Sequence, residues 1–149
     1  MATTTTAPLP AAGTGLTARR LAIAARLLLG LVFLASGIAG LVTTPPPVTS
    51  PPMSPAMVAL ANGLFGSGYL FQLVKLTEVA VGALLLANRF VPLALAALAP
   101  VTVNIVLVHL VLEPSGLPIA VPVLGLHLFL AWSYRGAYRA MLAARVEPG

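Results

Sequence analysis

The stretch GYLFQLVKLTEVAVGALLLANRFVPLALAALAPVTVNIVLVHLVLEP, residues 68–114, decides the fold of this chain. It holds two apolar runs, 69–87 and 90–112, which a short polar turn at Asn88 and Arg89 separates. Each run is close to the ~20 residues that an α-helix needs to cross ~30 Å of hydrocarbon. In lipid the backbone must satisfy its own hydrogen bonds, so a spanning segment is either helical or part of a closed barrel. The runs lack the alternation of a strand, and they therefore predict two transmembrane helices.

Two more apolar runs, 20–42 and 118–135, complete the pattern. The chain of 149 residues is 59% hydrophobic and only 7% charged. Soluble proteins typically carry about 25% charged residues, so a surface this poor in charge would aggregate in water. We therefore expect an all-α integral membrane protein, a four-helix bundle in a multi-pass arrangement.

The basic residues indicate how the bundle is oriented. Four spans in series place the flanks that carry these residues on the same side of the membrane. The residues are Arg19, Arg20, Arg26, Arg89, Arg135, Arg139 and Arg145. The other two connections, 43–68 and 113–117, contain no Lys or Arg. By the positive-inside rule, both termini are cytoplasmic. This topology also accounts for the net charge of +5, and basic residues interleaved with stacking aromatics, as in nucleic-acid binders, are absent.

The remaining segments divide the chain into a domain at 19–138 and two cytoplasmic tails. Residues 1–18 are rich in Thr, Ala, Pro and Gly without periodicity, which predicts a disordered tail, and 139–149 form the second tail. The first apolar run contains Arg26 and no cleavage site follows it, so it predicts a retained helix rather than a signal peptide.

The long connection 43–68 allows two interpretations. Ser54 can cap a helix that has Pro55 at its first position, which predicts a short outer helix over 54–65, interfacial or re-entrant. A plain loop is the alternative.

Polar residues inside the runs are the candidate site: Arg26, Lys75, Glu78, Asn104 and His127. An ionisable group in a membrane costs ~2.5–3.5 kcal/mol unless it finds a partner or a wet cavity. At ~1.5 Å per residue, Lys75, Glu78, Asn104 and His127 fall roughly 9–13 Å below the outer surface, in one layer. Arg26 lies roughly 8 Å beneath Glu78 and can reach it by extending upward.

This cluster has two interpretations, which the sequence leaves open. Lys75 and Glu78 are spaced as an i, i+3 ion pair, and with Arg26 they would staple the helices together. Alternatively, the cluster is a site for a solute, a proton or a quinone head group. Taken alone, Asn104 is more typical of an interhelical hydrogen bond than of a ligand contact, and His127 is more typical of a satisfied core histidine.

Several cofactors are excluded or disfavoured. The chain has no cysteine, which removes disulfides, thiolate metal sites and iron–sulfur clusters. A haem clamped by His109 and His127 is disfavoured, because these residues differ in depth by roughly 9 Å and His109 belongs near the outer interface. We predict no catalytic residue, no metal site and no cofactor other than a weakly bound quinone.

These residues resemble the DoxX family of small four-helix bacterial membrane proteins over about 20–135. The resemblance rests on RLLLGLVFLASGIAGL at 26–41, with Arg26, Gly30 and Phe33, and on the 68–114 stretch, with Glu78, Gly82 and the basic turn that follows. The chain departs from the family at Gly40, where members often have a Lys.

The resemblance implies a bacterial cytoplasmic membrane protein with a redox association. Some members are similar to a small subunit of thiosulfate:quinone oxidoreductase, and others associate with redox-defence enzymes. We therefore expect a non-catalytic membrane subunit or anchor for a redox partner, in contact with the lipid bilayer and without a nucleic-acid partner. A homo-oligomer is compatible with this expectation. The alternatives are a small-solute transporter or channel and an intramembrane quinone-linked oxidoreductase.

Overall fold

The computed structural model describes residues 13–43, 53–139 and 141. Within these residues the chain is all-helical and has no strand, as predicted. The predictions made for 1–12, 44–52, 140 and 142–149 lie outside the described residues.

Helix α1, Gly13–Val42, is the longest element at 30 residues, or ~45 Å. It begins earlier than the predicted span at 20, so residues 13–18 are helical rather than part of a disordered tail. The sequence from 13 to 42 contains no proline, and nothing in it breaks the helix once the helix has started.

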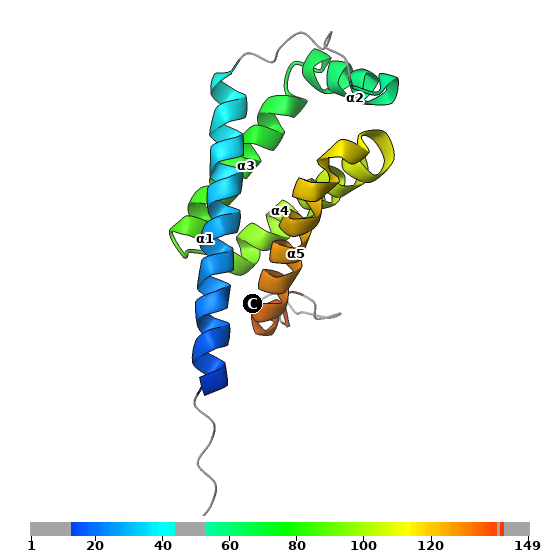
Figure 1. The fold of residues 1–149 in the computed structure, drawn as a ribbon. Helices are drawn as coiled ribbons and strands as arrows, with labels where there is room; N and C mark the ends of the chain where they lie inside the picture. The colour runs from blue at the N-terminus through cyan, green and yellow to red at the C-terminus, as the bar shows by residue number, and fades with distance from the viewer. Residues whose placement is uncertain (1–12, 44–52, 140, 142–149) are drawn as a thin grey trace, which may run out of the picture.

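Helix α2, Pro55–Gly66, confirms the prediction of a short helix in the long connection. The Ser54 side chain caps it by accepting a hydrogen bond of 3.1 Å from the Met57 amide. Helix α3, Leu70–Leu86, follows after a bend of 86°. Gly68 lies in this bend with φ +79°, a backbone conformation that side chains disfavour. As a result α2 lies across one end of the other helices (Figure 1).

The second half of the chain forms a helical hairpin. Helix α4, Val91–Leu107, continues as a π-helix over Val108–Leu112. A 3₁₀ turn at Pro114–Gly116 leads into helix α5, Leu117–Ser133, and a further 3₁₀ turn, Arg135–Tyr138, follows α5.

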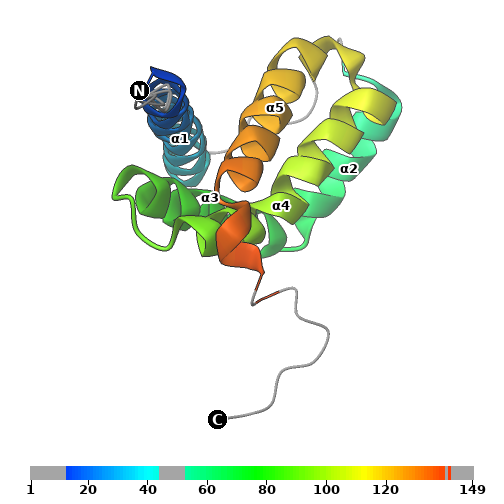
Figure 2. The same ribbon diagram turned by 90° about the horizontal axis from the view of Figure 1, so that it is seen from below.

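Four helices form the body of the molecule. Helix α1 packs along α3, α3 contacts α4, α4 contacts α5, and α5 returns to α1. The view along the bundle in Figure 2 shows this ring of α1, α3, α4 and α5. Its apolar core lies in the middle, and the side chains that are fully buried there include Leu29, Leu85, Leu95, Leu98 and Leu130.

Glycines let α1 and α3 approach closely. A Cβ atom on Gly82 would lie 2.6 Å from the Leu34 amide nitrogen, and one on Gly37 would lie 2.8 Å from the Val79 nitrogen. Small residues at a helix crossing are characteristic of helices that associate in membranes. Close backbone approach at these glycines therefore adds to the packing of buried side chains such as Leu29 and Leu85 in holding α1 against α3.

Three helical segments are long and apolar enough to cross a membrane: Gly15–Val42, Val91–Leu112 and Pro114–Ser133. A fourth span results if the bent pair of α2 and α3 is counted as one. The outward faces carry exposed large apolar side chains such as Leu31, Leu93 and Leu128. These features are consistent with a multi-pass membrane protein.

Candidate functional site

A cavity of about 290 Å³ lies beneath α2, between α2, α3 and the second half of α4 with its π-helix. Its wall is mostly apolar, with Met57, Leu60 and Leu64 contributed by α2. Four polar residues also line it: Lys75, Glu78, Asn104 and His109. Ligand sites typically combine an apolar wall with a few convergent polar groups. The cavity, which we call the outer cavity, is therefore the candidate site.

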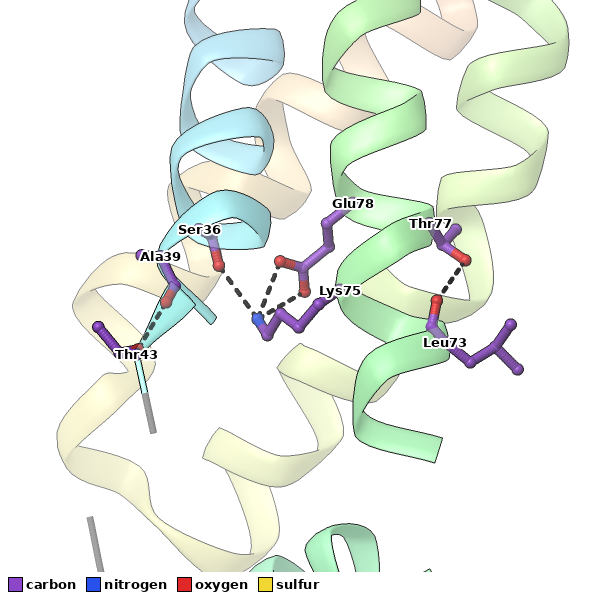
Figure 3. A network of polar contacts seen from close by, with 7 residues as sticks. All are labelled: Ser36, Ala39, Thr43, Leu73, Lys75, Thr77 and Glu78. Carbon is purple, nitrogen blue, oxygen red and sulfur yellow. Dashed lines mark hydrogen bonds and ion pairs between the residues drawn. The ribbon is translucent and has the colours of Figure 1, made fainter. Parts of the chain in front are cut away.

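The ion pair of Lys75 and Glu78 forms one side of the outer cavity. Lys75 Nζ lies 2.9 Å from Oε2 and 3.0 Å from Oε1 of Glu78, which confirms the predicted i, i+3 pair. Lys75 Nζ also donates to the Ser36 hydroxyl on α1 at 3.2 Å. Figure 3 shows the ammonium group between Ser36 and Glu78. Because the two charges cancel, the pair presents hydrogen-bonding groups to the cavity but no net charge.

Gly40 on α1 provides the space that the Lys75 side chain occupies. A Cβ atom on Gly40 would lie 2.5 Å from Lys75 Cδ and 2.8 Å from Cε. A side chain at position 40 would therefore displace Lys75 from its position beside Ser36.

Asn104 contributes an unpaired amide to the outer cavity. Within the part of the chain that the structure describes, its side chain has no hydrogen-bond partner. An amide has two N–H donors and a carbonyl acceptor, so Asn104 can hydrogen-bond to a ligand without first breaking a protein contact.

His109 lines the outer cavity too, although the sequence indicated a separate position for it. Residues 104 and 109 are ~140° apart on a regular α-helix. His109, however, belongs to the π-helix, which holds more residues per turn, and this change of pitch brings it towards the face of Asn104. Its Nδ1 atom lies 3.1 Å from the Glu113 carbonyl oxygen. Because a carbonyl only accepts, Nδ1 is assigned the proton and Nε2 is left as an acceptor.

His127 does not belong to the outer cavity. It is buried between α5 and α4, where Nδ1 lies 2.9 Å from the Thr102 hydroxyl oxygen. His127 thus matches the interpretation as a satisfied core histidine, and the predicted layer, which concerns depth in the membrane, stays a prediction. Thr102 was missed because a threonine in an apolar helix carries no strong sequence signal.

Arg26 has a different partner from the one predicted. It is buried and donates to the carbonyl oxygen of Leu85, and its contact with the Leu86 carbonyl is 3.5 Å. The last carbonyls of a helix lack partners within the helix and form the negative end of its dipole. Arg26 thus caps the C-terminus of α3. It faces the protein as expected, but it does not bind Glu78, which lies two helical turns away along α3.

A set of hydrogen bonds, which we call the latch, holds α2 over the outer cavity. The Ser54 amide donates to Glu113 Oε2 at 3.2 Å, and its hydroxyl donates to the Leu112 carbonyl at 2.7 Å. Ser115 donates to Glu113 Oε1 at 2.8 Å. The hydrogen bonds from Ser115 and then from Ser54 lower the pKa of Glu113 from its ordinary value. The contacts of Ser54 with Leu112 and Glu113 were not predicted, because they join residues that lie 58 and 59 positions apart in the chain.

The described residues contain no group of three or more His, Asp or Glu side chains placed to hold a metal ion. Comparison with protein-family models, with curated proteins and with solved structures finds no match to the chain. The outer cavity and the charges at the two ends of the bundle are therefore the features that bear on function.

Proposed function

We propose that the chain is a multi-pass protein of the bacterial cytoplasmic membrane, a bundle of four spans with both termini in the cytoplasm. Helix α3 is ~26 Å long and supplies the second span, slightly short of ~30 Å of hydrocarbon, which the bilayer accommodates by local thinning. Helix α2, bent by 86° from α3, then lies in the outer interface.

The distribution of cations supports this orientation. Arg19 and Arg20 are in the first turns of α1, Arg89 is in the α3–α4 turn, and Arg135 and Arg139 follow α5. The Tyr138 hydroxyl donates to the Pro92 carbonyl at 3.0 Å, which ties the end of α5 to the start of α4. By the positive-inside rule this basic end is cytoplasmic, and the end with α2 and the latch is outside.

Single cysteines test the orientation without interference, because the chain has no native cysteine. A cysteine at Ser115 should react with an impermeant thiol reagent in intact cells, and one at Asn88 should react only after the membrane is opened. The opposite labelling pattern would mean that the bundle has the reverse orientation in the membrane.

We infer that the outer cavity binds a small, neutral, mostly apolar molecule with carbonyl or hydroxyl groups, such as a quinone. The observation that carries this proposal is the unpaired Asn104 amide in an apolar cavity of about 290 Å³ beside a charge-neutral Lys75–Glu78 pair. A ring fits the apolar wall, its carbonyl can accept from Asn104, and a hydroxyl can donate to Nε2 of His109.

In this proposal the chain is a non-catalytic membrane subunit or anchor that serves a redox partner, as the resemblance to the DoxX family implies. A transporter would need a continuous path, whereas the residues below the outer cavity include core members such as Val81 and Leu98. The structure therefore favours a binding pocket with one polar end over a pore.

Titration of the purified protein with a short-chain quinone tests the proposal. Asn104→Leu should weaken binding by up to about tenfold, since one hydrogen bond contributes ~0.5–1.5 kcal/mol. The matched control is Gln72→Leu, which also removes an exposed amide but lies outside the outer cavity.

Equal losses in the two variants would contradict the assignment of the cavity. Turnover of a quinone substrate by the isolated wild-type chain, abolished in Glu78→Gln, would show an enzyme instead of an anchor.

A further inference from the structure

A second hollow lies at the basic end of the bundle, far from the outer cavity. It has a volume of about 470 Å³ and runs between the start of α1 and the end of α5. Ala18, Arg19 and Ala22 form one wall, and Phe129, Trp132 and Arg135 lie on the other. We call it the inner groove.

The inner groove combines cations with exposed aromatic surface. Arg19 and Arg135 are both exposed, as are Trp132 at 69% and Phe129 at 39%. The acidic residues within the described ranges, Glu78 and Glu113, lie at the outer cavity and the latch, so no carboxylate of those ranges neutralises the two guanidinium groups.

Arg135 is held in position before any ligand arrives. Its guanidinium carbon lies 4.9 Å from the centroid of the Trp132 ring, and Nη1 donates to the Trp132 carbonyl at 3.0 Å. The turn that carries Arg135 is itself fixed, because Tyr138 at its end bonds to the Pro92 carbonyl. A preorganised cation loses less conformational entropy on binding an anion.

Another hollow, separate from the outer cavity, adjoins the inner groove and extends the cationic surface. It shares Ser133 and Arg135 with the groove and adds Arg139. Cations therefore follow one another from α1 across to the segment after α5, at the level where the lipid head groups of the inner leaflet would lie in the proposed orientation.

We propose that the inner groove binds the phosphate head group of an anionic phospholipid, with an acyl chain against Phe129 and Trp132. Arginines between helices on the cytoplasmic side are suited to phosphate head groups, and the inner leaflet is where anionic lipids attract them. The groove can bind both parts of such a lipid, because its arginines pair with the phosphate and its aromatic wall contacts the acyl chain. This inference rests on the proposed membrane placement but not on the ligand of the outer cavity.

Trp132 provides a direct readout, because it is the only tryptophan of the chain and it lines the groove. The full-length protein is reconstituted into phosphatidylcholine vesicles that contain increasing amounts of brominated phosphatidylglycerol, and bromine quenching of Trp132 is measured. A parallel series uses brominated phosphatidylcholine. We expect the anionic lipid to quench at several-fold lower mole fraction than the zwitterionic lipid.

Removing single arginines tests whether the preference for the anionic lipid arises in the inner groove. Each of Arg19→Gln and Arg135→Gln should reduce the preference for the anionic lipid about fivefold, and the double variant more. The matched control is Arg89→Gln, which removes an exposed cation from the same end but outside the groove and should leave the preference unchanged. Because Arg135 contacts Trp132, lipid retained in native mass spectra is a second measurement for that variant.

Three results would overturn the proposal. The first is no preference for the anionic lipid in the wild type. The second is an equal loss in Arg89→Gln and Arg19→Gln, which would mean a diffuse surface charge. The third is full competition by millimolar inorganic phosphate, which would show a phosphate site without a lipid component. An orientation opposite to the proposed one would appear in the cysteine labelling and would leave these measurements intact.

Discussion

Two cationic side chains inside the bundle, Arg26 and Lys75, are satisfied in different ways. Arg26 is enclosed in the core and bonds backbone carbonyls at the end of α3. Lys75 bonds a carboxylate and a hydroxyl at the edge of an open cavity. A buried cation that bonds the carbonyls at the end of a helix secures that helix terminus, so the role of Arg26 is structural. A cation paired with a carboxylate beside a cavity retains neighbours that can rearrange around a ligand.

The largest loss of unfolding free energy should come from breaking the Lys75–Glu78 pair. Glu78→Leu leaves the Lys75 ammonium with the Ser36 hydroxyl and the Phe71 ring, whose centroid is 5.7 Å away, but without its carboxylate. Unpaired buried charges cost ~3–5 kcal/mol of unfolding free energy. The double variant Lys75→Leu, Glu78→Leu should lose less than Glu78→Leu alone. Chemical denaturation in detergent measures both.

Thr77→Val is the matched control, because the Thr77 hydroxyl bonds only within α3, to the Leu73 carbonyl at 2.8 Å. A double variant as unstable as Glu78→Leu would show that the ion pair does not govern stability at this site.

The next effect should come from Arg26→Leu, which leaves the carbonyls at the end of α3 without their charged donor. Hydrogen bonds to charged groups are worth ~1.5–3 kcal/mol, and we expect a loss of unfolding free energy in that range. Since Arg26 and Glu78 share no partner, the losses of Arg26→Leu and Glu78→Leu should add within ~0.5 kcal/mol. A clear departure from additivity would mean that the two groups interact after all.

The smallest effect concerns the latch and depends on pH. The pKa of Glu113 is lowered from 4.5, so the latch contributes stability above that value and loses it as the pH falls through the lowered pKa. The protection of the α2 amides, which is the intrinsic exchange rate divided by the measured rate, should therefore decrease below about pH 4.5 in the wild type. In Glu113→Gln this protection should be lower at neutral pH and should change little with acid. Identical pH profiles in the two proteins would exclude Glu113 as the titrating group.

The helices were predictable because apolar length and turn chemistry are local properties. Ser54 before Pro55 predicted α2, and the i, i+3 spacing of Lys75 and Glu78 predicted their bond. Arg26 was assigned to the right face of its helix but to the wrong partner, whereas His127 is the satisfied core histidine of one interpretation. Depth along the membrane normal follows from residue count, whereas the facing partner depends on how helices cross. His109 joined the cavity for another reason: a π-helix changes the rotation per residue, and no residue in 108–112 signals it.

The contacts that close the two ends of the bundle have a consequence for biogenesis. Ser54 and Glu113 are 59 residues apart in sequence, and so are Arg26 and Leu85. At ~5–20 residues per second, a ribosome needs about 3–12 s to make such a stretch. In the first such interval Arg26 has left the ribosome but its acceptor, the Leu85 carbonyl, has not yet been made. In the second, Ser54 and α2 have left the ribosome before Glu113, which secures them, has been made. The nascent chain therefore first carries Arg26 without a hydrogen-bond acceptor and later carries α2 without its latch. The outer cavity becomes complete only when the α4–α5 turn has been made.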